Sequence, residues 1–332
     1  MLVSCNGCNR TAEMPAKVIE APEYPVVLNR FEKELFEADS TQVNENLKRL
    51  YQKYGVFYTS YARDIMQMPE DPNDPMYLRT MNMLYHLHRM RELQQIIDSS
   101  FGDMGDIKKE LSSAMGIYHK AFPKNTVPQF TTYISEFGTA NIIFDSMICI
   151  GLDFYLNTRL IEFYRGLDFP EFRINKMQKV YIVPNAIKAL AIGQFDHQTS
   201  KDKRFLAQIL LEGKILYFMK SLMPQVADTV IMGYTQKQWQ WCKENEVPIW
   251  THFLDGNKLY GSEPGAFMRY LNDGPFTVAE GVPKESAPAI GSWIGWQIIN
   301  QYMNNQPMVS LNELMYDTNF DKILKLSKYR PK

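Results

Sequence analysis

The apolar positions are densest over residues 204–223, and this pattern predicts a helix that neighbouring elements cover on most sides. Three polar residues, Gln208, Glu212 and Lys214, interrupt the middle of this helix. Gly213 costs about 1 kcal/mol against alanine inside a helix, so it predicts a neighbouring element at close range. A carboxylate in such a helix is either paired in the core or part of a site, and Glu212 is a candidate for both roles.

Helical patterns also run through the first third of the chain. Residues 24–68 show helical spacing with one break. The next helix is predicted to begin at Asp74, which can cap it, and at Pro75, whose fixed φ suits a first turn. Its apolar face continues to Ile96. A further helix is predicted over residues 106–122.

The pattern changes after residue 126. Residues 127–137 are rich in β-branched and aromatic side chains between Pro128 and Gly138, and residues 141–155 hold two apolar runs separated by a polar pair. Both stretches predict short strands of a small sheet, and helical spacing returns after Arg159. We therefore expect an α+β fold that is mainly helical, with helices around a small β-sheet.

A helix over residues 236–254 is predicted in the C-terminal third. Thr235 and Gln238 form a capping-box pattern at its start, and Pro248 is expected to kink it.

The last long helix is predicted over residues 288–304. Gly291 and Gly295 lie four positions apart on it, so they leave a groove for another helix. Trp293 and Trp296 project from another side of the same helix.

Composition excludes some classes of partner. The chain of 332 residues is 45% hydrophobic, which is enough for a substantial core. Its formal net charge of −1 and its lack of a basic patch predict no binding to nucleic acid. No run of about 18 apolar residues occurs, so no internal helix is expected to cross a membrane.

The first residues resemble the end of a bacterial lipoprotein signal. Leu2 begins a lipobox pattern that ends at Cys5, the residue that would carry the lipid and attach the protein to a membrane. Residues 1–5 are therefore interpreted as the remnant of a signal peptide. Residues 6–25 are polar and proline-bearing, which predicts a flexible tether, and residues 26–332 are expected to form a single globular domain.

The residue after Cys5 and the other cysteines allow two further predictions, one about the membrane and one about disulfides. Asn6 after the lipidated residue favours the outer membrane over the inner membrane. Cys8 lies in the predicted tether, and Cys149 and Cys242 lie singly in apolar segments. A disulfide between Cys149 and Cys242 is one interpretation, and two buried free thiols are the favoured one.

The order of helices, sheet and glutamate-bearing helix is similar to the zincin metallopeptidase plan. Zinc on such a helix needs two histidines four positions apart. The corresponding positions around Glu212 are Leu211 and Ile215, and no two histidines in the chain have this spacing. The sequence therefore predicts no zinc site, and it indicates no other metal or cofactor.

Outside the zinc question, the sequence gives only weak signals for a catalytic or binding site. Glu212 is the only candidate catalytic residue, and core pairing is its alternative role. The tryptophans either pack in the core or line a pocket or a protein-binding face. The candidates for that pocket or interface are Glu212, Trp239, Glu246, Trp250, Trp293 and Trp296, and the other acids of interest are Asp145, Asp153 and Glu244.

Several motifs in fixed order resemble the gliding motility-associated lipoprotein family GldB. They are Gly151-Leu152-Asp153, Tyr181-Ile182-Val183-Pro184, Glu212-Gly213-Lys214-Ile215-Leu216-Tyr217, Gly233-Tyr234-Thr235, Trp241-Cys242-Lys243-Glu244-Asn245-Glu246, Asn272-Asp273-Gly274-Pro275-Phe276 and Gly291-Ser292-Trp293-Ile294-Gly295-Trp296.

The resemblance implies a lipid-anchored protein of the bacterial envelope that works with gliding or type IX secretion machinery. Asn6 favours the outer membrane, and the lack of an acidic run after Cys5 argues against surface display, so we expect the periplasmic face. The resemblance also implies a zincin-like fold that lacks the metal ligands, and it transfers no catalytic residue. We therefore expect a non-catalytic protein that acts through contacts with envelope proteins. The alternative is a hydrolase, or a protein that binds peptide or carbohydrate, using Glu212 in an aromatic-lined cleft.

Overall fold

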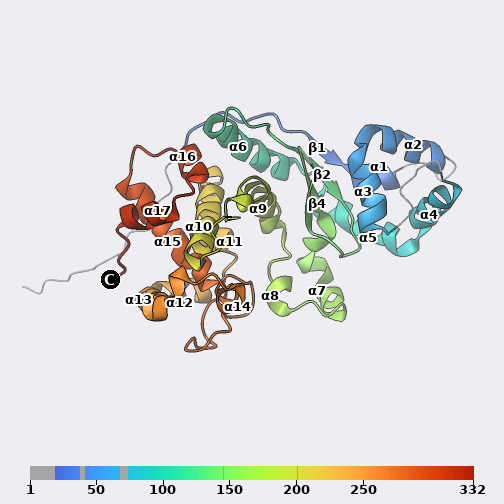
Figure 1. Ribbon diagram of the computed structural model, residues 1–332. Coiled ribbons are helices and arrows are strands. Elements are labelled where there is room, and N and C mark those ends of the chain that lie inside the picture. Colours follow the sequence, from blue (N-terminus) through green and yellow to red (C-terminus); the bar gives the residue numbers. More distant parts are fainter. Residues whose placement is uncertain (1–18, 38–41, 68–73, 145, 200) are drawn as a thin grey trace, which may run out of the picture.

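The computed structural model describes residues 19–37, 42–67, 74–144, 146–199 and 201–332. Within these ranges the chain is mainly helical and contains one small sheet, which confirms the α+β class. In Figure 1 the sheet lies between a group of N-terminal helices on one side and a larger group of C-terminal helices on the other.

The sheet has four strands in the order β1-β2-β4-β3. β1 runs parallel to β2 and β2 runs parallel to β4, whereas β3 forms an antiparallel edge on β4. The strands are β1 (Leu28–Arg30), β2 (Gln129–Tyr133), β3 (Asn141–Phe144) and β4 (Met147–Gly151).

Three of these strands lie in the two stretches predicted to form the sheet. β1 corrects the prediction that the whole stretch 24–68 is helical. Three residues are too few to show the alternation that marks a strand, and β1 is defined by its pairing with β2, where Leu28 lies opposite Phe130.

The N-terminal helices follow β1 directly. The predicted helix that begins at Asp74 and Pro75 is divided at Leu87, because the Leu87 backbone is extended. His88 starts the next helix, and its side chain is exposed. Asp74 accepts a hydrogen bond from the Met76 N–H, as a cap should. These helices are α1 (Phe31–Phe36), α2 (Val43–Tyr54), α3 (Val56–Ser60), α4 (Pro75–His86) and α5 (His88–Phe101).

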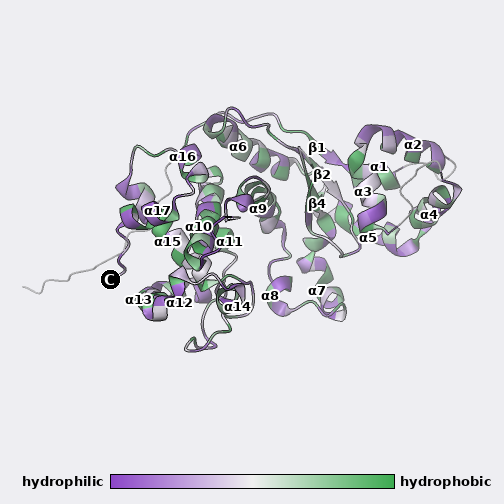
Figure 2. Cartoon of the chain, viewed as in Figure 1, coloured by the Kyte–Doolittle hydropathy of each residue, from purple (hydrophilic) through white to green (hydrophobic). Residues whose placement is uncertain are grey.

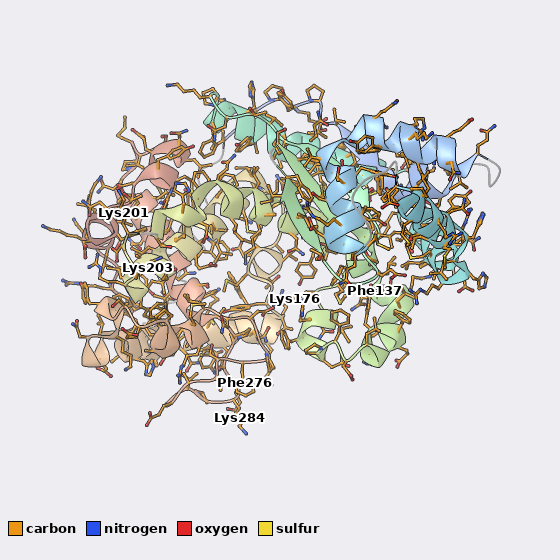
Figure 3. All side chains as sticks on the ribbon, turned by 45° about the vertical axis from the view of Figure 1, so that its right-hand side comes forward. Phe137, Lys176, Lys201, Lys203, Phe276 and Lys284 are labelled. Atoms are coloured by element: carbon orange, nitrogen blue, oxygen red, sulfur yellow. The ribbon has the colours of Figure 1, made fainter. Side chains whose placement is uncertain are left out.

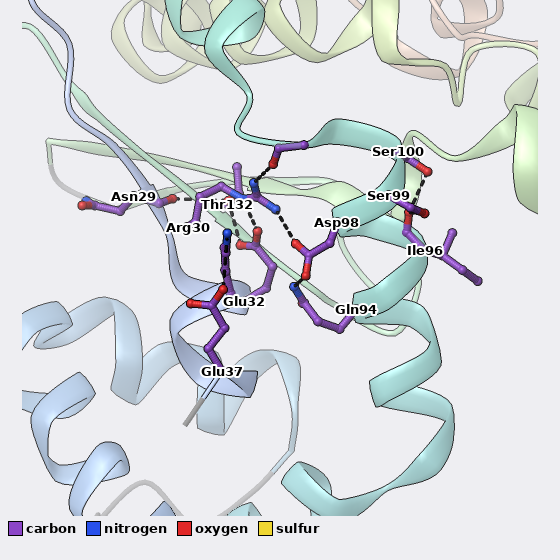
Figure 4. Close-up of polar contacts among 12 residues, drawn as sticks. Asn29, Arg30, Glu32, Glu37, Gln94, Ile96, Asp98, Ser99, Ser100 and Thr132 are labelled. Carbon is purple, nitrogen blue, oxygen red and sulfur yellow. Dashed lines mark hydrogen bonds and ion pairs between the residues drawn. The ribbon is translucent and has the colours of Figure 1, made fainter. Parts of the chain in front are cut away.

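A buried carboxylate connects these helices to the sheet. Glu32 is fully buried, pairs with Arg30, and accepts a hydrogen bond of 2.7 Å from the Thr132 hydroxyl on β2 (Figure 4). Arg30 also reaches Asp98 on α5, at 3.2 Å. Burial raises the Glu32 pKa, and the Arg30 charge and the Thr132 hydrogen bond oppose that shift.

Residues 19–27 cross the molecule as an extended strap over α6 (Gly105–Ala121), along the top of Figure 1. The Tyr24 N–H donates to the Ser112 carbonyl at 3.0 Å. A Cβ atom on Gly116 would lie 2.0 Å from the Pro22 carbonyl oxygen, so only glycine permits this approach. Residues 19–25 of the predicted tether therefore lie against the folded domain.

The predicted central helix is α10 (Phe205–Leu222), and it does not pack directly on the sheet. α9 (Ile182–Phe195) covers β3 and β4, and α10 packs against α9 and α15 (Ile290–Asn305). α9 thus lies between α10 and the sheet. Figure 2 shows hydrophobic residues along α9 and α10 and hydrophilic residues along α2.

α10 and α15 cross at glycines, as both glycine patterns predict. A Cβ atom on Gly213 would lie 2.3 Å from the Gly295 carbonyl oxygen, and one on Gly295 would lie 1.8 Å from the Ile209 carbonyl oxygen. The backbones of the two helices therefore touch with no side chain between them.

The predicted helix over residues 236–254 is two helices. The break falls at Asn245, three residues before the expected kink at Pro248, and the Thr235–Gln238 capping box is formed.

The remaining elements include α7 (Asn157–Gly166), α8 (Glu171–Ile174), α11 (Asp228–Met232), α12 (Gln236–Glu244), α13 (Glu246–Leu254), α14 (Pro264–Phe267), α16 (Leu311–Tyr316) and α17 (Phe320–Ser327).

Candidate functional site

Glu212 lines a cavity of about 280 Å³ between α9, α10, α8 and the start of α15. Its side chain is partly buried and forms no hydrogen bond or ion pair with any other residue in the described part of the chain. The interpretation of Glu212 as a core carboxylate satisfied by a partner is therefore not supported by its surroundings.

α9 supplies two more polar side chains to this cavity, Asn185 and Lys188. They lie three positions apart in a helix that is otherwise mostly apolar, so they share one face. Sequence analysis missed them, although the signal was the same as for Glu212: polar residues at helical spacing in an apolar segment.

Tyr155 forms the sheet side of the cavity and is firmly held. The amide nitrogens of Asn141 and Asn185 both lie 3.1 Å from its hydroxyl oxygen. Burial raises the Tyr155 pKa, and these two hydrogen bonds oppose the shift. The Asn185 side chain thus links α9 to the end of the sheet.

Two of the residues that line the cavity form an ion pair. Lys176, just after α8, pairs with Asp273 at 2.6 Å and passes over the backbone of Gly233. Gly233 has φ +71°, a conformation that favours glycine. Figure 3 shows Lys176 between the two groups of helices, and Arg173 on α8 lines the same cavity.

The N-terminus of α15 also borders the cavity through Ala289 and Ser292. Ala289 adopts a left-handed conformation with φ 49°, which is uncommon for a residue other than glycine. No side chain caps this helix end. Ser292 is 4% exposed, and its hydroxyl has no partner among the described residues.

The predicted tryptophan group divides into two separate clusters, and neither lines the cavity. Trp239 packs edge-on against Trp293, with ring centroids 4.7 Å apart, and lies 6.0 Å from Trp296. Trp293 and Trp296 are both 2% exposed. Their indole nitrogens are buried with no partner among the described residues. This cluster belongs to the core.

The second cluster lies at α13. Trp250 packs edge-on against Tyr329, and the Tyr329 hydroxyl donates to Glu246 at 2.7 Å. Burial raises the Glu246 pKa, and the Tyr329 hydrogen bond opposes that shift. The break at Asn245 separates Trp250 and Glu246 from Trp239, so the structure does not bring the predicted pocket residues together.

Asp153 has a structural position rather than a place in the cavity. Its carboxylate is fully buried and accepts hydrogen bonds from the Ser135 N–H and hydroxyl and from the Phe137 N–H, the last at 2.6 Å. Burial raises its pKa to about 6 despite these donors.

Glu244 is exposed and accepts a hydrogen bond from the Gln240 side chain. Asp145 lies outside the described residues.

Lys214 is a buried charge that the sequence pattern did not single out as a site. Its ammonium group donates to the Gln198 side chain at 2.6 Å and to the Asp317 carbonyl at 3.1 Å. Burial lowers the Lys214 pKa to about 7. These bonds connect α10 to the segment before α17.

No group of three or more histidine, cysteine or acidic side chains in the described ranges has the arrangement of a metal site. Cys149 and Cys242 are buried free thiols, which confirms the favoured interpretation. Cys5 lies outside the described residues.

The family model described as gliding motility protein GldB matches residues 13–331, which is nearly the whole chain. The chain belongs to the GldB family. No curated protein and no solved structure matches it. GldB membership indicates a gliding-motility lipoprotein of the cell envelope. Among the described helices, none has the length and apolar character of a membrane span.

Proposed function

We propose that this GldB protein is held at the periplasmic face of the outer membrane by lipid on Cys5. There it acts without catalysis, through protein contacts in the gliding or type IX secretion machinery. The match of the GldB family model to residues 13–331 carries this proposal. The lipobox that ends at Cys5 and the polar segment after it support the anchor.

A zincin-like plan without metal is part of the proposal. Two observations support it: β3 is an antiparallel edge strand, and α9 packs beside it with the cavity at its face. On α9 the positions with the zinc-ligand spacing include Pro184 and Lys188, neither of which is a usual zinc ligand. Stoichiometric zinc in the purified protein, removed by a chelator with loss of stability, would contradict this part.

Hydrolysis is the less supported use of the cavity. A second carboxylate or a nucleophile would have to stand free beside Glu212 to share the chemistry. Among the described lining residues the other carboxylate is Asp273, and Lys176 already neutralises it. The Ser292 hydroxyl lines the cavity, but no base is hydrogen-bonded to it in the described part of the chain that could activate it as a nucleophile. The cavity is therefore better suited to binding than to bond cleavage.

The test of the proposal uses a gliding bacterium that lacks its own GldB protein. The full chain is expressed behind a complete lipoprotein signal as wild type, Cys5→Ala, Cys8→Ala and Glu212→Gln. We expect Cys5→Ala to lose palmitate labelling, membrane attachment and motility, whereas Cys8→Ala and Glu212→Gln keep all three. Equal membrane fractions for Cys5→Ala and wild type would refute the anchor, and immobile cells with membrane-attached Glu212→Gln would show that motility needs Glu212, for binding or for catalysis.

A further inference from the structure

The cavity beside Glu212 contains groups of opposite charge that have no partner. Glu212 on α10 and Lys188 on α9 both line it, and neither forms an ion pair with a described residue. Ser292 on α15 adds a hydroxyl that is 4% exposed and unbonded. Glu212 and Lys188 are partly buried, whereas Ser292 is almost fully buried, and a polar residue as buried as Ser292 normally has a hydrogen-bond partner. A free hydroxyl beside two unpaired charges in one cavity points to a ligand.

Part of the cavity lining suits an anion. Lys188 and Arg173 supply positive charge, and the uncapped N-terminus of α15 adds the partial positive charge of a helix of 16 residues. Ser292 lies in the first turn of that helix and can donate a hydrogen bond to an anionic oxygen.

Glu212 suits the opposite charge. Its carboxylate can accept hydrogen bonds from an ammonium group, and the nearby cation Lys176 is already bound to Asp273. Three cations and two carboxylates line the cavity in total, so the described lining carries a small positive excess. A ligand with a carboxylate and an amine fits this balance better than a simple cation.

The rest of the wall and the size of the cavity narrow the ligand further. The apolar residues that line the cavity include Leu216, Met219 and Val230. A volume of about 280 Å³ is close to the lower end of ligand pockets, roughly 300 Å³. Both features favour a small ligand with one apolar side chain.

We propose that this cavity binds a small zwitterion, an amino acid or dipeptide with an apolar side chain. The carboxylate lies toward Lys188, Ser292 and the start of α15, and the amine lies toward Glu212. The site is already formed without ligand, because Asn185 holds Tyr155 on one wall and the Lys176–Asp273 pair joins two others. The proposal does not depend on lipid anchoring or on gliding.

Titration calorimetry on the purified chain tests the two ends separately. The probes are leucine, leucyl-alanine, N-acetyl-leucyl-alanine and leucyl-alanine amide. We expect saturable binding of leucine or leucyl-alanine, and at least a tenfold weaker affinity when either end of the dipeptide is blocked. No saturable heat from leucine or leucyl-alanine at millimolar concentrations would overturn the proposal.

Two variants test which residue binds the amine of the ligand and which binds its carboxylate. Glu212→Gln should weaken the free dipeptide and leave the N-acetyl form unchanged, whereas Lys188→Met should weaken the free dipeptide and leave the amide unchanged. Glu244→Gln and Lys284→Met are matched controls on exposed residues outside the cavity, and both should bind like wild type. Circular dichroism checks that each variant is folded. Equal affinities for wild type, Glu212→Gln and Lys188→Met would place the ligand elsewhere and overturn the assignment.

Discussion

The crossing of α10 and α15 makes Gly295 a sharp test of the packing. In Gly295→Ala the new Cβ atom would lie 1.8 Å from the Ile209 carbonyl oxygen and 2.7 Å from the Ile209 carbonyl carbon. An ordinary contact between such atoms is about 3.5 Å, so the helices must separate by roughly 1.5 Å. The clashing atoms are backbone, which cannot rotate away as a side chain can.

The expected cost follows from two opposing effects. Overpacking a close-packed interior usually costs about 1–3 kcal/mol and sometimes more. Alanine gains about 1 kcal/mol over glycine in a helix, which offsets a part of that cost. Because the helices would separate along most of α10, we expect Gly295→Ala to lower the free energy of unfolding by about 3 kcal/mol.

Urea unfolding followed by circular dichroism and tryptophan fluorescence measures this change. Gly166→Ala is the matched control, because a Cβ atom at the end of α7 meets no atom within 4 Å. It should be neutral or stabilise the protein by up to about 1 kcal/mol. If Gly295→Ala were as stable as Gly166→Ala, the helices would not cross at their backbones and the description of the core would be wrong.

Three further predictions concern stability. The Lys214 pKa of about 7 lies below its value in the unfolded chain, so the unfolded state binds more protons between about pH 7 and 10. Stability therefore rises with pH in this range, by at most about 1.4 kcal/mol per pH unit. Lys214→Met should flatten this slope when unfolding is measured across the same range. Asp153→Asn removes an acceptor from the Ser135 and Phe137 N–H groups and should cost about 1–3 kcal/mol in urea unfolding. Ser310→Ala removes the cap of α16 and should cost about 1 kcal/mol in thermal unfolding, and an unchanged midpoint would contradict the capping geometry.

Sequence pattern was most informative where contacts are local. The cap at Asp74, the capping box at Thr235 and the short strands after residue 140 depend on residues close in the chain, and all three predictions are confirmed. The glycines at positions 213 and 295 also predicted a close approach of another helix, because only a missing Cβ explains glycine inside a packed helix.

Non-local structure was harder to predict. β1 exists through its pairing with β2, and the break at Leu87 follows from extended backbone that no proline or glycine announces. The site shows the same limit. Glu212 could be singled out on one helix, but its neighbours Lys188 and Ser292 come from two other helices, and their meeting depends on how those helices pack.

The strap over α6 determines how far this protein could reach from a bilayer. With lipid on Cys5, the covalent chain of about 14 residues from Cys5 to Ile19 would limit the distance between the lipid and the start of the strap to at most roughly 50 Å. If residues 19–27 left α6, the distance between the lipid and the rest of the domain could increase by about 30 Å. With such an anchor, the contact between Pro22 and Gly116 would limit the distance between the domain and the membrane, and a bulkier residue at position 116 is expected to displace the strap and increase that distance.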